Sequence, residues 1–201
     1  MAKDMDRQPV LIGERLELRP LVPSDWAGLF AVSSDPLLWA HHPVHDRWLE
    51  PVFRAFFDDA LAQGGALAVI ERASGRIIGS SRYQGFTSEN GGRVEIGWTF
   101  LARELWGGGL NAELKRLMLS HALTFVERVE FRVGESNIIS RRAMEKIGGR
   151  LLPQVEQIAT DHGEIVHVVY QIDRAGFANG PLSLANSPSA ADTAPLRRSP
   201  D

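Results

Sequence analysis

Residues 93–125 read RVEIGWTFLARELWGGGLNAELKRLMLSHALTF, and this stretch combines the patterns of a strand, a glycine-rich loop and a helix. Its first part, residues 93–101, has the composition of a strand that Gly97 interrupts, and a glycine inside a strand often marks a bulge or a close approach of other backbone. In residues 111–125, apolar side chains such as Leu114, Leu117 and Met118 recur at steps of three and four. This spacing predicts an amphipathic helix that follows the strand across a glycine-rich loop.

The loop between them, WGGGLN, runs from Trp106 to Asn111. Three consecutive glycines leave backbone amides uncovered, and the N-terminus of the following helix adds partial positive charge, so the loop predicts a phosphate or pyrophosphate site. An ordinary tight turn is the alternative that the glycines alone leave open. Neither the dinucleotide-binding fingerprint nor a Walker loop is present in the chain.

Outward from this stretch, hydrophobic periodicity predicts a mixed α+β domain. The expected strands are residues 14–19, 67–71, 76–83, 93–101, 129–133, 150–157 and 165–172, and the expected helices are residues 26–32, 51–63, 111–125 and 140–147. The helix at 111–125 should cross over between two parallel strands, 93–101 and 129–133. We expect one domain over residues 8–173 and, because residues 174–201 are rich in Ala, Ser, Pro, Asn and Gly, a disordered C-terminal tail.

Composition narrows the classes of function. The formal net charge of −3 is too small to supply a basic surface for nucleic acid. The chain has no cysteine, which excludes disulfides, thiolate metal sites and an acyl-cysteine intermediate. The first residues, MAKDMDRQPV, are charged, and no stretch is apolar for long enough to span a bilayer, so we expect a cytoplasmic protein without a membrane partner.

Four stretches in order, LELRPL, VEIGWTFL, LWGGGLNAELKRLMLSHAL and NIISRRAMEKIGGR, resemble the GCN5-related N-acetyltransferases (GNAT). Within that family the chain is similar to the branch of the ribosomal-protein N-terminal acetyltransferases, RimJ and RimL. The resemblance covers about residues 11–172 and implies a mostly antiparallel sheet of six to seven strands with a V-shaped splay, flanked by about four helices. The family's loop pattern, Gln/Arg-x-x-Gly-x-Gly/Ala, falls on Trp106, Gly109 and Asn111, of which only Gly109 matches the consensus.

The resemblance implies that acetyl-CoA is the co-substrate and that no metal takes part. Its pantetheine arm would enter the splay between strands 93–101 and 129–133, and a backbone amide near Trp98 would stabilise the oxyanion. Arg142 is the residue expected at the coenzyme's 3′-phosphate, although exposed helix charges also explain Arg141 and Arg142. The full set of expected donor-binding residues is Trp98, Thr99, Phe100, Trp106, Gly107, Gly108, Gly109, Leu110, Asn111, Asn137, Ser140 and Arg142.

Two side chains are candidates for the chemistry. Ser140, in the Asn-x-x-Ser spacing that starts at Asn137, is the group expected near the leaving sulfur; the alternative is that Ser140 only caps a helix. Glu95 is the expected general base, against the alternative that it lies on the solvated face of a strand. The two tyrosines, Tyr83 and Tyr170, fall on other strands.

The segment HHPVH, residues 41–45, allows two interpretations, a metal site or a border of the acceptor pocket, and the sequence favours the second. We therefore expect direct transfer of an acetyl group from acetyl-CoA to a primary amine in a ternary complex. The acceptor would be a small-molecule amine or a peptide N-terminus, and a homodimer is the assembly to test. The alternative function is a non-catalytic acyl-CoA-binding module.

Overall fold

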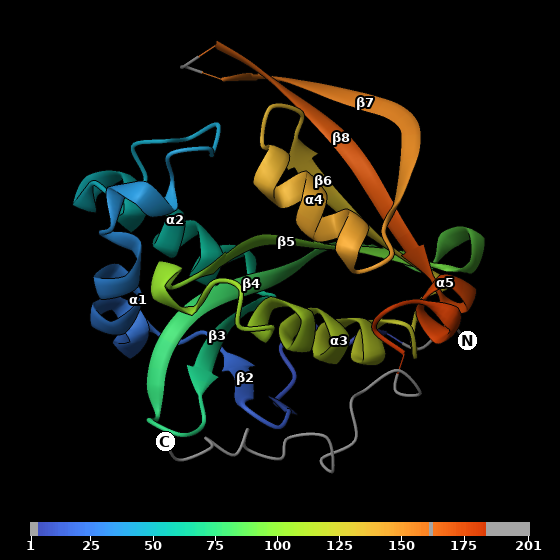
Figure 1. The fold of residues 1–201 in the computed structure, drawn as a ribbon, viewed down its shortest axis with the longest axis horizontal. Helices are drawn as coiled ribbons and strands as arrows, with labels where there is room; N and C mark the ends of the chain where they lie inside the picture. Colours follow the sequence, from blue (N-terminus) through green and yellow to red (C-terminus); the bar gives the residue numbers. More distant parts are fainter. Residues whose placement is uncertain (1–3, 161–162, 184–201) are drawn as a thin grey trace, which may run out of the picture.

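The computed structural model describes residues 4–160 and 163–183, which form one eight-stranded sheet and five α-helices (Figure 1). The strands are β1 (Leu11–Ile12), β2 (Leu16–Pro20), β3 (Ala66–Glu71), β4 (Arg76–Thr87), β5 (Arg93–Leu101), β6 (Arg128–Gly134), β7 (Arg150–Thr160) and β8 (Gly163–Asp173). The helices are α1 (Trp26–Ser33), α2 (Glu50–Gln63), α3 (Leu110–Ala122), α4 (Ile138–Lys146) and α5 (Arg174–Asn179). The mixed α+β class predicted from the sequence is confirmed.

The strand order is β1-β2-β3-β4-β5-β6-β8-β7, and every neighbouring pair is antiparallel except β5 and β6. These two strands are parallel and are joined by α3, as predicted. They pair only from Arg93 opposite Arg128 to Glu95 opposite Glu130, after which the ladder ends. The sheet therefore opens into the expected V between β5 and β6, which we call the splay.

The sheet has more strands and helices than the resemblance implied. The additional strand is β1, a two-residue edge strand that is too short to show a period of alternation in the sequence. The additional helix, α5, lies in the segment expected to be a disordered tail, where Asp173 caps it by accepting from the Gly176 amide and Leu182 is buried. The ordered part thus continues past residue 173, and the tail prediction for residues 184–201 lies outside the described residues.

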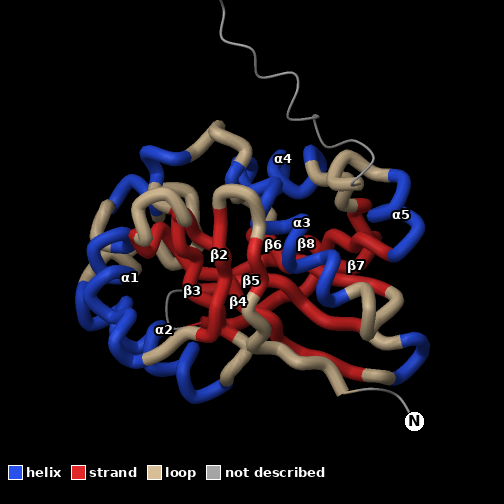
Figure 2. Tube along the Cα trace, turned by 90° about the horizontal axis from the view of Figure 1, so that it is seen from below, coloured by secondary structure: helices blue, strands red, loops and turns tan. Residues whose placement is uncertain are grey.

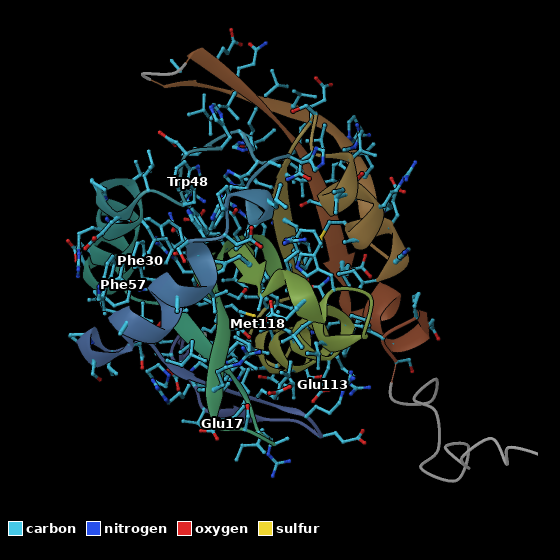
Figure 3. The ribbon with its side chains drawn as sticks, turned by 60° about the vertical axis from the view of Figure 1, so that its left-hand side comes forward. Glu17, Phe30, Trp48, Phe57, Glu113 and Met118 are labelled. Atoms are coloured by element: carbon cyan, nitrogen blue, oxygen red, sulfur yellow. The ribbon has the colours of Figure 1, made fainter. Side chains whose placement is uncertain are left out.

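Strand β3 shows how the sheet separates two cores. Leu67 and Val69 face a large core that includes α3, whereas Ala68 and Ile70, which alternate with them, face a second core with α1 and α2. Figure 2 shows α1 and α2 on one side of the molecule and α3, α4 and α5 on the other. In Figure 3, Phe30 and Phe57 mark the second core and Met118 marks the first.

Candidate functional site

Strand β5 carries a β-bulge at the start of the splay. The pairing with β4 passes from Gly97 opposite Arg82 to Phe100 opposite Ser80, so Trp98 and Thr99 together face a single residue of β4. Trp98 has a φ of 52°, a left-handed conformation that is rare for a residue with a side chain. The sequence placed the irregularity at Gly97, whereas the backbone turns at Trp98. Phe100 is buried among the rings of the second core, so only its backbone is available to a ligand.

The loop after β5 exposes backbone amides at the start of α3. Gly107 and Gly109 adopt φ values of 81° and 80°, which favour glycine, and Gly109 is the N-cap of α3. Within the described chain, the amides of Gly107, Gly109, Leu110 and Asn111 bond to no backbone carbonyl, and Glu113 is the first residue to bond back, to Gly109. The loop and the helix N-terminus therefore leave these amides uncovered, and the phosphate site that the glycines predict stays a prediction.

Two side chains that the sequence did not single out hold this loop. The buried Glu113 carboxylate accepts from the amides of Arg15 and Leu16, at 2.8 and 3.1 Å, and pairs with Arg15 Nε at 3.1 Å. Arg15 Nη1 in turn donates to the Gly108 carbonyl at 2.7 Å. A hollow of about 600 Å³ lies beside the loop and is lined in part by Arg15, Arg72 and Trp106. Trp106 is 46% exposed and its indole donates to the Leu101 carbonyl.

Asn137 and Ser140 lie at the start of α4, directly after β6. Asn137 Oδ1 accepts from the Ser140 amide at 3.1 Å, so Asn137 is the N-cap and the interpretation of Ser140 as the cap is wrong. The half-exposed Ser140 hydroxyl makes no hydrogen bond to another described residue. Arg142 is exposed, whereas Arg141 contacts the Tyr170 hydroxyl and the Glu135 carbonyl.

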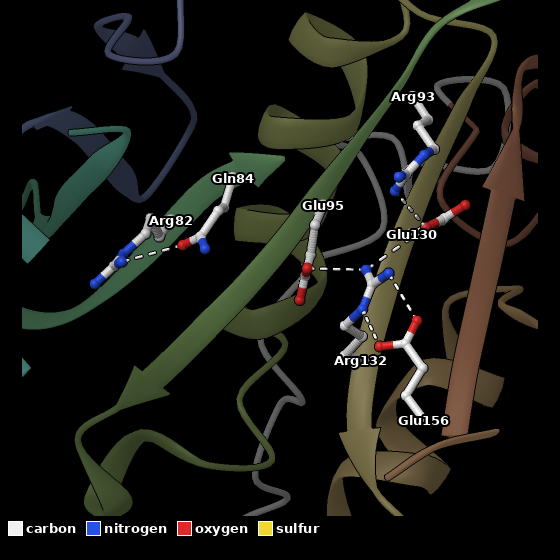
Figure 4. Close-up of polar contacts among 7 residues, drawn as sticks. All are labelled: Arg82, Gln84, Arg93, Glu95, Glu130, Arg132 and Glu156. Atoms are coloured by element: carbon white, nitrogen blue, oxygen red, sulfur yellow. Dashed lines mark hydrogen bonds and ion pairs between the residues drawn. The ribbon is translucent and has the colours of Figure 1, made fainter. Parts of the chain in front are cut away.

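Glu95 belongs to a cluster of charged side chains on the sheet face opposite α3 (Figure 4). Arg132 donates to Glu95 Oε2 at 2.9 Å and makes two further bonds to the Glu156 carboxylate at 2.8 and 2.9 Å. Glu130 lies 3.5 Å from Arg132 and 3.1 Å from Arg93. Three carboxylates thus share two guanidiniums, and the interpretation of Glu95 as a solvated side chain is wrong because it is 9% exposed.

Two opposing effects act on the pKa of the Glu95 carboxylate. Burial raises its pKa above the ordinary value, and the adjacent Arg132 lowers it by a smaller amount. Gly97 makes room for the carboxylate, since a methyl group at that position would lie 3.1 Å from Glu95 Oε1. One oxygen of Glu95 is therefore fixed by Arg132, and the other lies against Gly97, one residue before the bulge at Trp98.

Lys115 is a second residue that the sequence did not single out. It is 2% exposed, and its ammonium donates to Thr99 Oγ1 at 2.7 Å and lies 5.4 Å from the centre of the Phe131 ring. Thr99 Oγ1 also contacts the hydroxyl of Ser81 at 2.8 Å. No carboxylate among the described residues pairs with Lys115, and burial lowers its pKa to about 7. A buried lysine thus joins α3 to the bulged part of β5.

The tyrosines have other partners. The Tyr83 hydroxyl donates to the Met118 carbonyl at 2.6 Å, and the Tyr170 hydroxyl contacts Arg141 and Glu145. Both rings are fully buried. Neither hydroxyl is free to protonate a leaving group without giving up a bond that it makes in the fold.

The HHPVH segment closes over the end of β6. An added methyl group at Gly134 would lie 2.9 Å from Pro43, which shows how closely the segment approaches this strand. His42 is mostly buried, and burial lowers its pKa to about 3. Within residues 4–160 and 163–183 no group of three or more His, Asp or Glu side chains is placed to hold a metal ion, and no helix has the length and apolar character of a membrane span.

The expected site residues therefore occupy three places. Glu95, Trp98, Thr99 and Phe100 lie on β5, the Trp106–Asn111 loop leads into α3, and Asn137, Ser140 and Arg142 lie at the start of α4. The splay between β5 and β6 separates the first and third groups, and Glu95 and Ser140 make no direct contact.

Comparisons with known proteins agree with this fold. A model of the acetyltransferase (GNAT) domain matches residues 15–150. Among solved structures, a probable acetyltransferase of the GNAT family from Chromobacterium violaceum superposes with a TM-score of 0.77 at 21% identity, over 88% of this chain and 92% of that one. A putative acetyltransferase from T. thermophilus has a TM-score of 0.69 at 25% identity, over 84% and 90%.

RimJ from Mycobacterium smegmatis, solved in complex with CoA-disulfide, has a TM-score of 0.61 at 20% identity, over 83% of this chain and 86% of that one. A search of the curated proteins finds no significant match.

Proposed function

Because the chain belongs to the acetyltransferase (GNAT) family, an acetyl-CoA-dependent N-acetyltransferase family, we propose that it moves the acetyl group directly onto a primary amine in a ternary complex. The observation that carries this proposal is the bulge at Trp98, which lies at the mouth of the splay with Glu95 beside it. The family assignment favours an enzyme over the non-catalytic acyl-CoA-binding module. The RimJ/RimL-like branch is part of the proposal and rests on the sequence resemblance, while the likeness to RimJ supports the fold alone.

The donor would bind through backbone more than through side chains. The amides of Gly107, Gly109, Leu110 and Asn111, which bond to no backbone carbonyl of the described chain, fit the pyrophosphate, and the open splay gives the pantetheine arm a strand edge on which to lie. Asn137 and Ser140 at the start of α4, with the exposed Arg142, would border the same path. Thr99 is a weaker candidate for direct contact because its hydroxyl is already bonded to Lys115 and Ser81.

In the reaction, the neutral amine nitrogen attacks the thioester carbon, and the carbon–sulfur bond breaks as the coenzyme thiolate leaves. We assign to Glu95 the proton that the amine loses, directly or through water, because burial raises its pKa and one of its oxygens lies against Gly97, next to the bulge. The free hydroxyl of Ser140 would donate to the leaving thiolate, whose thiol has a pKa of about 8.5. The absence of cysteine from the chain supports a path without an acyl-enzyme.

The donor site is tested by placing a negative charge in the loop. Gly109→Glu should abolish measurable acetyl-CoA binding by calorimetry and transfer with it, because the carboxylate would repel the pyrophosphate. Gly85→Glu is the matched control, since Gly85 also has a positive φ but lies on β4, away from the loop. Unchanged coenzyme affinity in Gly109→Glu would refute the loop assignment.

The chemistry is tested separately with variants that leave the loop intact. Glu95→Gln should retain acetyl-CoA binding and lose transfer by about 10²-fold or more, and Ser140→Ala should lower kcat with little change in coenzyme affinity. The readouts are coenzyme release and mass spectrometry of the acetylated amine. If the parent protein binds acetyl-CoA but transfers to no amine or peptide in a broad panel, the non-catalytic module is the correct interpretation.

A further inference from the structure

Arg47 carries a guanidinium that forms no ion pair with a carboxylate among the described residues. Its central carbon lies 5.2 Å from the centre of the Trp39 ring and 4.6 Å from that of Phe56, so the group is held against two aromatic rings. Burial lowers its pKa to about 10, and the neighbouring Asp46 raises it by a smaller amount.

The nearest polar group does not satisfy Arg47. His42 Nε2 lies 3.4 Å from Arg47 Nη1, while the Val44 amide donates to His42 Nδ1 at 2.9 Å. The Val44 amide bond places the proton of the neutral imidazole on Nε2, whereas in the other tautomer Nδ1 donates to the Val44 carbonyl at 3.2 Å and Nε2 accepts from Arg47 Nη1. In either tautomer the neutral imidazole gives Arg47 at most one long hydrogen bond and no negative charge.

Arg47 belongs to the same face of the sheet as the Glu95 cluster. Arg47 and Arg82 are close enough to repel each other electrostatically. The Arg82 guanidinium lies 4.7 Å from the centre of the Trp98 ring at the bulge. His42, next to Arg47, interacts electrostatically with His167 on β8, and His167 interacts in the same way with Glu156 and Arg132. The segment that carries Arg47 and His42 also touches the end of β6 through Pro43. Arg47 is thus near the end of the splay and not on a remote surface.

The charges around Trp98 are divided by sign. On one side lie the carboxylates of Glu95, Glu130 and Glu156, which outnumber Arg93 and Arg132. On the other side lie Arg47 and Arg82, of which Arg82 pairs with Asp59 and Arg47 forms no ion pair but interacts at longer range with the neighbouring Asp46. Two buried nitrogens in this area, Arg82 Nε and His167 Nδ1, have no hydrogen-bond partner within the described part of the chain. A ligand that fits must bring its cationic end to Glu95 and an anionic group to Arg47.

We propose that Arg47 binds a carboxylate of the acceptor, so that the acceptor is a small amine that also carries a carboxylate, that is, an amino acid or a close analogue. The inference rests on the proposed function, because it takes Glu95 as the place where the amine is deprotonated. A planar guanidinium suits a carboxylate, which it meets with two parallel hydrogen bonds. The rings of Trp39 and Phe56 hold that guanidinium in place before the acceptor arrives.

The test uses pairs of acceptors that differ only in the carboxylate. Phenylalanine is compared with phenethylamine, leucine with isoamylamine and lysine with cadaverine, within a panel of the standard amino acids. The parent protein should acetylate at least one amino acid with a kcat/KM about tenfold or more above that of its decarboxylated partner. Equal rates across the pairs, or a preference for the decarboxylated amines, would overturn the inference and leave the proposed function standing.

Variants then assign the preference to Arg47. Arg47→Gln should raise the KM for the amino acid by about tenfold or more and leave the kcat/KM of the decarboxylated amine and the affinity for acetyl-CoA unchanged. Arg47→Lys should restore part of the loss. Arg54→Gln is the matched control, because Arg54 also lies over a ring, that of Trp26, but pairs with Glu50 on α2. An equal loss for both members of a pair would mean that Arg47 only supports the fold.

A binding measurement separates this inference from the chemistry. Calorimetry of the protein saturated with CoA should detect the preferred amino acid, and Arg47→Gln should abolish that binding even when no turnover is measured. If no amino acid binds, or if transfer is confined to peptide N-termini that carry no carboxylate, the inference is wrong.

Discussion

Arg132 on β6 donates to Glu95 on β5 over 2.9 Å, across the gap that opens where the two strands stop pairing. This bond affects the protonation of Glu95, the proposed base. Burial raises the pKa of Glu95, and Arg132 lowers it. Removing the guanidinium in Arg132→Gln should therefore raise the pKa of Glu95 further. Because the base must be ionised to act, the acidic limb of the kcat/KM profile should move to higher pH, and activity should fall more near pH 6 than near pH 8.

This prediction is checked by a profile from about pH 5 to about pH 10 with the preferred acceptor. Arg93→Gln is the control, because Arg93 pairs with Glu130 and not with Glu95. An acidic limb that stays in place or moves to lower pH in Arg132→Gln would show that Glu95 is not the titrating base.

Lys115 makes the stability of the fold depend on pH. Its pKa is about 7 in the folded chain and 10.5 as an ordinary value, so between these limits the unfolded chain binds more protons than the folded one. The free energy of unfolding should therefore rise as the pH is raised from about 7 to about 10.5. In Lys115→Met this rise should disappear, and below about pH 7 the variant should be more stable than the parent by on the order of 2–4 kcal/mol.

Urea unfolding at pH values within and below that window measures this difference. Lys146→Met is the control, because Lys146 is exposed on α4. A Lys115→Met variant that is less stable at every pH would mean that the bond to Thr99 outweighs the cost of burying the amine.

The order of strands and helices could be predicted because alternation and helical spacing are local properties of the chain. The side chains that organise the site could not, because each is defined by a neighbour far away in sequence. Lys115 and Arg132 are charged residues that a local pattern assigns to solvent, and only the packing of α3 on β5, and of β6 beside β8, buries them. The bulge was predicted one residue early, since glycine is the usual sign of such a backbone and Trp98 is not.

Arg15 links the β1–β2 edge of the sheet to the donor loop, through Glu113 and the Gly108 carbonyl. In Arg15→Met the loop loses one of its fixed points while the amides that face the pyrophosphate remain. We expect the KM for acetyl-CoA to rise by roughly threefold to tenfold with kcat nearly unchanged, which is the pattern of a lost binding contribution. Arg72→Met is the control, since Arg72 bonds to the carbonyls of Gly13 and Glu14 and not to the loop. An unchanged KM would mean that the loop holds its shape without Arg15.

Gly134, the last residue of β6, fixes how closely the segment with His42 and Arg47 approaches the splay. An alanine there would place its Cβ 2.9 Å from Pro43 Cγ and 3.4 Å from Pro43 Cδ, so Pro43 and the segment must move away. The φ of Gly134 is not positive, and the substitution therefore adds no backbone strain of its own. Gly134→Ala should raise the KM for the acceptor several-fold and leave acetyl-CoA affinity unchanged.

One substitution at Pro43 removes both ring atoms that an alanine at Gly134 would meet. Pro43→Ala deletes both Cγ and Cδ, so the double variant Gly134→Ala with Pro43→Ala should recover much of the acceptor affinity that Gly134→Ala loses. This recovery is a coupling energy between the two residues, which a double-mutant cycle measures directly from the four KM values. Additive losses would show that the segment does not control acceptor binding through this contact, and a loss of acetyl-CoA affinity in Gly134→Ala would mean that the end of β6 serves the donor instead.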